Sequence, residues 1–205
     1  GMVANGMKGV TGDFRDENGN LYEKYKDVEV KKLFDDGLKE LGMTPDQVKL
    51  TLIVDEKGTG KKEGEFYQAQ WKEKLGIDVA VEVLTYKERL SRGKEGNFEI
   101  IRYAWGPDYA DAMTYLEIFL STSEGLNIGK YNNPEYDRLV LDGQVNQDEK
   151  ARVTSMQNAE KILIEDFIYS GLYYEVAMYI KKPGLEGVVL RSVGNPVDFY
   201  NAVMK

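Results

Sequence analysis

One succession of elements occurs twice in the first half of this 205-residue chain: a helix that ends in Leu-Gly is followed by a short apolar strand. Between positions 30 and 41 apolar residues recur at helical spacing, Gly42 supplies a left-handed stop, and a strand is expected at 49–54. A second helix over 61–75 stops at Gly76, and alternating valines indicate a strand at 79–83. Strand, helix and strand in this order form a right-handed crossover between parallel strands, which predicts an α/β layer.

A third strand is expected at 98–103, after a short helical stretch at 86–92 and just before a Trp-Gly-Pro sequence. Residues 1–26 are rich in glycine, asparagine and charged residues and show little periodicity, so we expect a loop that leads to the first helix. The first half of the chain is therefore predicted to hold a parallel sheet of three strands with helices packed against it.

The second half is expected to be helical up to position 167. Helices are predicted at 112–120 and 134–141, and Pro134 suits a first helical turn because its missing N–H needs no partner there. Asn146 and Glu149 fit a capping box, which would start a long helix with an apolar stripe from Met156 to Phe167. From 169 onward the residues indicate short strands and turns.

The composition excludes several classes of function. The chain has no Cys and no His, which removes thiol nucleophiles, Ser-His and Cys-His pairs, and the nitrogen and sulfur ligands of structural zinc sites. Acidic residues outnumber basic ones by 35 to 27, and the lysines alternate with acids, so nucleic acid is not an expected partner. No apolar run approaches the roughly 20 residues that a membrane-spanning helix needs.

Two segments resemble ion-binding motifs without completing them. The sequence GTGKK at 58–62 is similar to a phosphate loop, but that motif needs Gly where Asp55 stands and Ser or Thr where Lys62 stands. The acidic turn at 16–19 is similar to a calcium loop, yet Phe14 and Tyr25 occupy ligand positions. We interpret the first as a strand-to-helix loop and the second as a surface turn.

The segment 104–111 combines two aromatic residues, Trp105 and Tyr109, with two acids, Asp108 and Asp111. It follows the third predicted strand, and ligands of open α/β sheets bind beyond the carboxyl ends of parallel strands. An aspartate beside aromatic faces suits an ammonium group, through a charge-assisted hydrogen bond and a cation–π contact.

A purely structural interpretation of the same segment is also open. A Gly-Pro turn would leave Trp105 and Tyr109 covering the edge of the core, and Asp111 would cap the helix that follows. We favour capping for Asp111, whereas Trp105 and Asp108 fit either interpretation. Two carboxylates in a cleft are also typical of glycosidases, but Asp108 and Asp111 are three residues apart across a turn, which favours binding over catalysis.

Further motifs follow in a fixed order along nearly the whole chain. The most specific are Phe98-Glu99-Ile100, the sequence WGPDY at 105–109 and the sequence YNNPEYD at 131–137. Supporting positions are Arg152, the run AEKIL at 159–163, Tyr173-Tyr174 and Lys182-Pro183. In this order the chain resembles the large oligopeptide-binding proteins, which are the solute receptors of peptide ABC importers.

The resemblance implies one lobe of a two-lobed bacterial receptor, similar to periplasmic binding proteins, with a parallel or mixed sheet flanked by helices. Such a receptor closes on an extended peptide without chemistry, cofactor or metal and delivers it to the membrane permease of an ABC transporter. Family members are longer, so the chain resembles their C-terminal portion. Residues 1–167 would then form the ligand-binding lobe, and 168–205 a closing segment that crosses toward the partner lobe.

The resemblance also implies where the receptor works and which residues bind. An extracellular, cell-surface or periplasmic monomer is expected, attached to the membrane only through a lipidated cysteine outside this chain. Asp108 matches the position that holds the peptide's α-amino group, Trp105 lies beside a side-chain pocket, and Tyr109 and Asn127 are further candidates. The rival interpretations are a receptor of the same family for a sugar or a metal chelate, and a carboxylate glycosidase.

Overall fold

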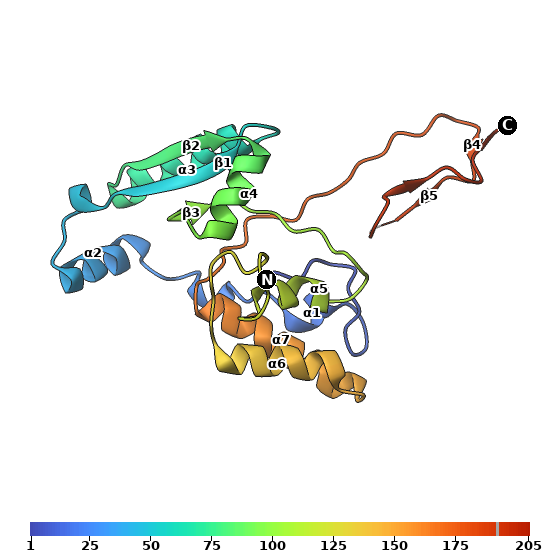
Figure 1. The fold of residues 1–205 in the computed structure, drawn as a ribbon, viewed down its shortest axis with the longest axis horizontal. Helices are drawn as coiled ribbons and strands as arrows, with labels where there is room; N and C mark the ends of the chain where they lie inside the picture. The colour runs from blue at the N-terminus through green and yellow to red at the C-terminus, as the bar shows by residue number, and fades with distance from the viewer. Residues whose placement is uncertain (192) are drawn as a thin grey trace. The chain divides into compact units, whose positions relative to one another are not determined.

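The computed structural model describes residues 1–191 and 193–205, and they form two compact units (Figure 1). We call the first the helical unit; it comprises Gly1–Tyr22, Trp105–Ser123 and Tyr131–Lys205. The second, the sheet unit, comprises Glu23–Ala104 and Glu124–Lys130.

The sheet unit contains the predicted parallel sheet. Its strands are β1 (Leu50–Asp55), β2 (Val79–Leu84) and β3 (Ile100–Ile101), in the order β2-β1-β3. β1 runs parallel to both neighbours, with Leu50 opposite Val79 and Leu52 opposite Ile100. The buried residues Leu52, Val54, Ile77 and Val79 form the core of this unit. The predicted α/β crossover is therefore confirmed.

The helices of the sheet unit end where glycine permits a left-handed backbone. They are α2 (Val30–Leu41), α3 (Gly60–Leu75) and α4 (Tyr86–Glu95), with the short 3₁₀ turn η2 (Pro45–Gln47) between α2 and β1. Gly42 and Gly76, with φ of 65° and 77°, follow α2 and α3 as predicted. Gly64 lets α3 approach the sheet, since a Cβ there would lie 2.8 Å from Cγ1 of Val81.

The third strand is shorter than the six residues expected at 98–103. At its start, the carboxylate of Glu99 accepts the N–H of Thr51 at 3.1 Å, so a side chain replaces the backbone partner. At its end, Arg102 N still donates to Ile53 O at 2.9 Å, although Arg102 falls outside the two-residue strand. The prediction was correct in place and direction but too long.

The helical unit is built on two packed helices, α6 (Pro134–Val145) and α7 (Glu149–Glu165) (Figure 1). Pro134 occupies the first turn as predicted, and Asn133 caps the helix by accepting from the N–H groups of Glu135 and Tyr136. Three shorter helical pieces, α1 (Phe14–Asn18), α5 (Met113–Leu116) and η3 (Glu117–Phe119), also belong to this unit. Its fully buried residues include Val3, Phe14, Leu116, Tyr136, Met156, Ala159 and Leu163.

Three expectations about this part of the chain were wrong. Residues 1–26 are not simply a loop: they contain α1 and η1 (Glu23–Tyr25), and Val3 and Phe14 are fully buried. The cap of α7 is Asp148, which accepts from Ala151 N at 2.8 Å, so the Asn146–Glu149 capping box does not form. Phe167 lies beyond α7 with φ of 52° and 70% of its surface exposed, so it does not extend the apolar stripe.

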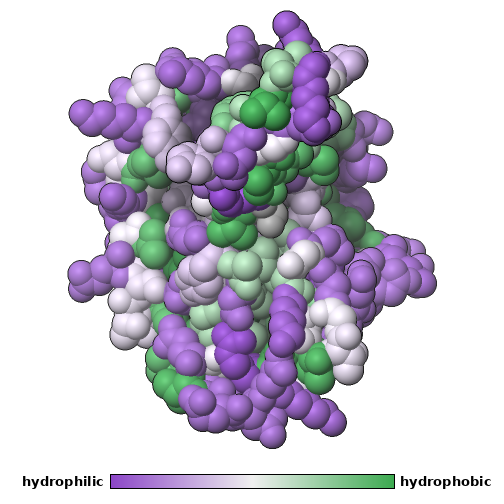
Figure 2. Space-filling view, turned by 90° about the vertical axis from the view of Figure 1, so that its right-hand side faces the viewer, coloured by the Kyte–Doolittle hydropathy of each residue, from purple (hydrophilic) through white to green (hydrophobic). Residues whose placement is uncertain are grey.

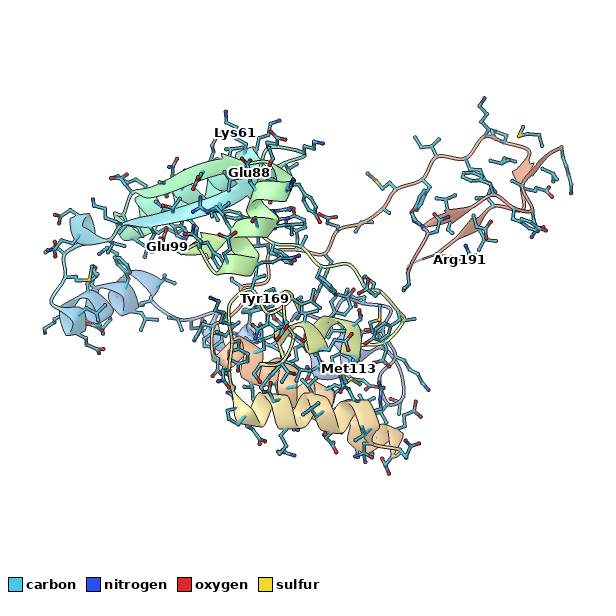
Figure 3. All side chains as sticks on the ribbon, in the orientation of Figure 1. Lys61, Glu88, Glu99, Met113, Tyr169 and Arg191 are labelled. Atoms are coloured by element: carbon cyan, nitrogen blue, oxygen red, sulfur yellow. The ribbon has the colours of Figure 1, made fainter. Side chains whose placement is uncertain are left out.

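The last part of the chain carries short strands, as expected. β4 (Leu185–Glu186) pairs antiparallel with β7 (Val203–Met204), and β5 (Val189–Leu190) with β6 (Val197–Asp198). Arg191, labelled in Figure 3, follows β5 and pairs with Asp198 at 2.6 Å. The face shown in Figure 2 carries hydrophobic residues among hydrophilic ones. Within the described ranges, no helix has the length and apolar character needed to cross a membrane.

Candidate functional site

The segment that follows β3 is held against α5 and η3 by three hydrogen bonds within the helical unit. Trp105 Nε1 donates to Thr114 O at 2.8 Å, and Asp108 N donates to Thr114 Oγ1 at 3.0 Å. The Tyr109 hydroxyl donates to Glu117 Oε1 at 2.6 Å. Thr114 and Glu117 are three residues apart and therefore lie on the same side of the α5–η3 segment. The loop is bonded to this side at both residues.

Asp111 has a structural role, as the sequence indicated. Its Oδ1 accepts from Met113 N at 2.9 Å at the start of α5, which is labelled at Met113 in Figure 3. Both of its oxygens also bind Arg152 of α7, each at 2.9 Å. These hydrogen bonds raise the pKa of Arg152. Asp111 thus anchors the start of α5 to α7.

The carboxylate of Asp108, in contrast, is available to a ligand. Its side chain is exposed, and only its backbone N–H is bonded, to Thr114. No hydrogen bond or ion pair to another residue of the described part of the chain engages the carboxylate. The loop therefore fixes the position of Asp108 while leaving its charge unpaired. Beside it, the half-buried Trp105 packs against the core of the helical unit.

Tyr109 is 40% exposed, and its hydroxyl faces acidic groups. Burial raises the pKa of this phenol well above 10, and the hydrogen bond to Glu117 raises it further, as do the charges of Glu117, Asp111 and Asp108. Tyr109 therefore remains a protonated donor at neutral pH. The hydroxyl of Tyr109 is close enough to three carboxylates for their charges to raise its pKa.

Three of the four candidate residues come together in this arrangement. Trp105, Asp108 and Tyr109 lie on the loop of the helical unit, whereas Asn127 belongs to the sheet unit. Asn127 is half-buried and its carbonyl accepts from Lys130 N at 3.1 Å. Sequence reasoning missed Thr114 and Glu117. Their positions three and six residues after Asp111, inside the predicted helix at 112–120, were the signal that could have found them.

The chemistry of this arrangement is that of binding a cation. An unpaired carboxylate, on a loop whose backbone and Trp105 indole N–H are both bonded to Thr114, offers a charge-assisted hydrogen bond to an ammonium group. The second carboxylate of the segment, Asp111, is already paired with Arg152. Over residues 1–191 and 193–205, no group of three or more acidic, His or Cys residues is arranged to hold a metal ion.

Comparison with known proteins places the chain in a family. The family of bacterial extracellular solute-binding proteins, family 5 (Middle), matches residues 1–127, and the chain belongs to this family. It is 32% identical over 151 residues to the periplasmic murein peptide-binding protein MppA of Escherichia coli, covering 74% of the chain and 27% of MppA. It is 28% identical over 193 residues to the oligopeptide-binding protein OppA of Bacillus subtilis, covering 93% of the chain and 35% of OppA.

A solved structure agrees with these relatives. Listeria monocytogenes OppA bound to peptide matches 98% of the chain and 38% of its own length, with a TM-score of 0.78 and 25% identity. The resemblance to oligopeptide-binding proteins and the α/β fold expected from it are confirmed. The chain spans only about a third of the length of these relatives. The family consists of extracellular binding proteins.

Proposed function

We propose that the chain is the ligand-capturing lobe of a receptor that binds peptides and delivers them to an ABC importer. The observation that carries the proposal is the unpaired carboxylate of Asp108, on a loop fixed at Thr114, in a chain whose relatives are named for peptide binding. In this proposal Asp108 receives the α-amino group of the peptide. Trp105 lines the adjacent side-chain pocket, and Tyr109 and Asn127 make further contacts.

The peptide is held without chemistry. Asp111, the second carboxylate that the sequence offered for a glycosidase, is paired with Arg152 and accepts from Met113 N at the start of α5, and this pairing supports binding over hydrolysis. The lack of histidine disfavours a nickel-type chelate, and the negative charge of the unpaired Asp108 carboxylate favours an amine over a neutral sugar. We therefore place receptors for those solutes second and a glycosidase third.

The second lobe of the receptor is proposed to lie outside this chain. Residues 168–205 would cross toward it, leaving 1–167 as the ligand-binding lobe. Exposed apolar side chains at 172–180 support this division, because exposed apolar surface of this kind marks a site of contact with another surface. Leu172, Val176, Met178 and Ile180 expose between 51% and 104% of their surface. The intact receptor would be a monomer outside the cytoplasm that meets an ABC permease and is tethered by a lipid anchor outside this chain.

Native mass spectrometry of the intact receptor tests this function. Protein purified from its host should carry peptides of mixed sequence, because the proposed contacts are to the backbone and the terminal amine. Refolded, ligand-free receptor should then bind synthetic peptides in calorimetry. A receptor that co-purifies with a sugar or a metal chelate and does not bind peptides would contradict the proposal and favour a receptor for those solutes. Turnover of a chromogenic glycoside would favour the third.

A further inference from the structure

Glu117 contacts the loop that carries the proposed amine site and is held in place from two sides. Its carboxylate accepts the hydroxyl of Tyr109 at 2.6 Å. Its backbone carbonyl accepts the hydroxyl of Ser123 and, at 3.3 Å, the N–H of Leu120. The side chain and the backbone of Glu117 are thus both anchored. Its charge therefore has a defined place beside the loop that carries Asp108.

The charges around Tyr109 do not balance. The carboxylates of Asp108, Asp111 and Glu117 all act on the Tyr109 phenol, and Arg152 pairs with Asp111 alone. Among the described residues, neither Asp108 nor Glu117 forms an ion pair with a lysine or arginine. Three carboxylates against one guanidinium leave two negative charges. A single α-amino group opposite Asp108 would neutralise only one of them.

We infer that Glu117 makes the receptor prefer peptides with a basic side chain on their first residue. This inference rests on the proposed function, in which the α-amino group is bound by Asp108. A lysine or arginine side chain that leaves the same residue would meet the remaining carboxylate, whereas an acidic one would be repelled. Because Glu117 is partly exposed and already accepts a hydrogen bond, the preference for lysine should be modest, about two- to fivefold in Kd.

Calorimetry on the intact receptor tests the inference with three tetrapeptides that differ only in their first residue: Lys-Ala-Ala-Ala, norleucine-Ala-Ala-Ala and Glu-Ala-Ala-Ala. The native receptor should bind them in that order, and the lysine preference should shrink at high salt. Glu117→Gln keeps an acceptor for Tyr109 but removes the charge. In this variant lysine and norleucine should bind equally.

Asp16→Asn is the matched control, because Asp16 is an exposed acid of the same unit whose carboxylate is unpaired within the described residues. It removes the same charge away from the loop and should keep the lysine preference. A lysine preference that persists in Glu117→Gln, or is absent from the native receptor, would overturn the inference and leave peptide binding intact. A receptor that binds none of the three peptides would instead overturn the proposed function, and the inference with it.

Discussion

Glu17 closes the loop before α1 by accepting hydrogen bonds from three consecutive backbone N–H groups. The donors are Val10, Thr11 and Gly12, at 2.8, 2.7 and 2.8 Å. The backbone N–H of Thr11 is the largest cause that lowers the pKa of Glu17, from 4.5 to about 2. This carboxylate is exposed, so the shift comes from directed donors and not from burial.

At the residue scale this gives a pH prediction. Because the folded pKa lies below the unfolded one, Glu17 stabilises the fold above pH 4.5 and loses that effect as the pH falls toward 2. The carboxyl carbon of Glu17 should titrate near pH 2 in NMR. The stability difference between the native chain and Glu17→Gln should shrink over the same range. A titration midpoint near 4.5 would show that the loop does not hold the carboxylate.

Individual residues also show what the sequence could not reveal. The aromatic and acidic loop at 105–109 was recognisable because its residue types are unusual together and follow a strand. Glu117 was not, since its role depends on a contact with Tyr109 that only folding creates. Likewise, the fully buried Glu160 accepts from Val3 N at 2.8 Å and from Arg15 Nη1 at 2.7 Å, across more than 140 residues of sequence.

Among the secondary-structure elements, the sequence predicted correctly those features that depend on interactions between neighbouring residues. Gly42 and Gly76 marked helix ends correctly, because a left-handed stop is a property of the residue itself. The N-terminal segment was misjudged, because Val3 and Phe14 are buried by distant partners in the helical unit. The cap of α7 was misplaced by two residues, because Asn146 and Asp148 are both good caps and only geometry distinguishes them.

The cap of α7 can be tested by two alanine substitutions. Asp148→Ala should lower the free energy of unfolding by about 1 kcal/mol, because the first-turn N–H of Ala151 loses its acceptor. Glu149→Ala should cost much less, since that side chain makes an exposed ion pair with Lys8. Urea denaturation of both variants measures the difference. If Glu149→Ala lowers the free energy of unfolding as much as Asp148→Ala does, the Asn146–Glu149 capping box would be supported instead.

At the scale of the whole molecule, the exposed tail leads to a prediction about proteolysis. In the isolated chain, residues 172–180 lack regular secondary structure and expose apolar side chains, so chymotrypsin should cut there first. In the intact receptor the proposed second lobe should cover the same bonds and slow the cleavage. The helices α6 and α7 provide the internal control, and they should stay intact in both. Equal cleavage of the tail in both proteins would contradict the proposed crossing.

The isolated chain should also bind peptide poorly. A receptor that closes around its ligand divides its contacts between two lobes, and this chain spans about a third of its relatives. Calorimetry should therefore detect weak binding or none, at millimolar Kd or beyond. A micromolar Kd for the isolated chain would show that one lobe suffices.

The most direct test of the account is whether Asp108 pairs with the peptide's α-amino group in the intact receptor. If closure buries this pair, breaking it costs about 3–5 kcal/mol, so Asp108→Asn should weaken binding by roughly two to four orders of magnitude. N-acetylation of the peptide should weaken binding to the native receptor by a similar factor. The measurement is the double cycle of both changes, in which acetylation should cost the Asp108→Asn receptor far less than the native one. Equal losses in both receptors would contradict the account and place the amine elsewhere.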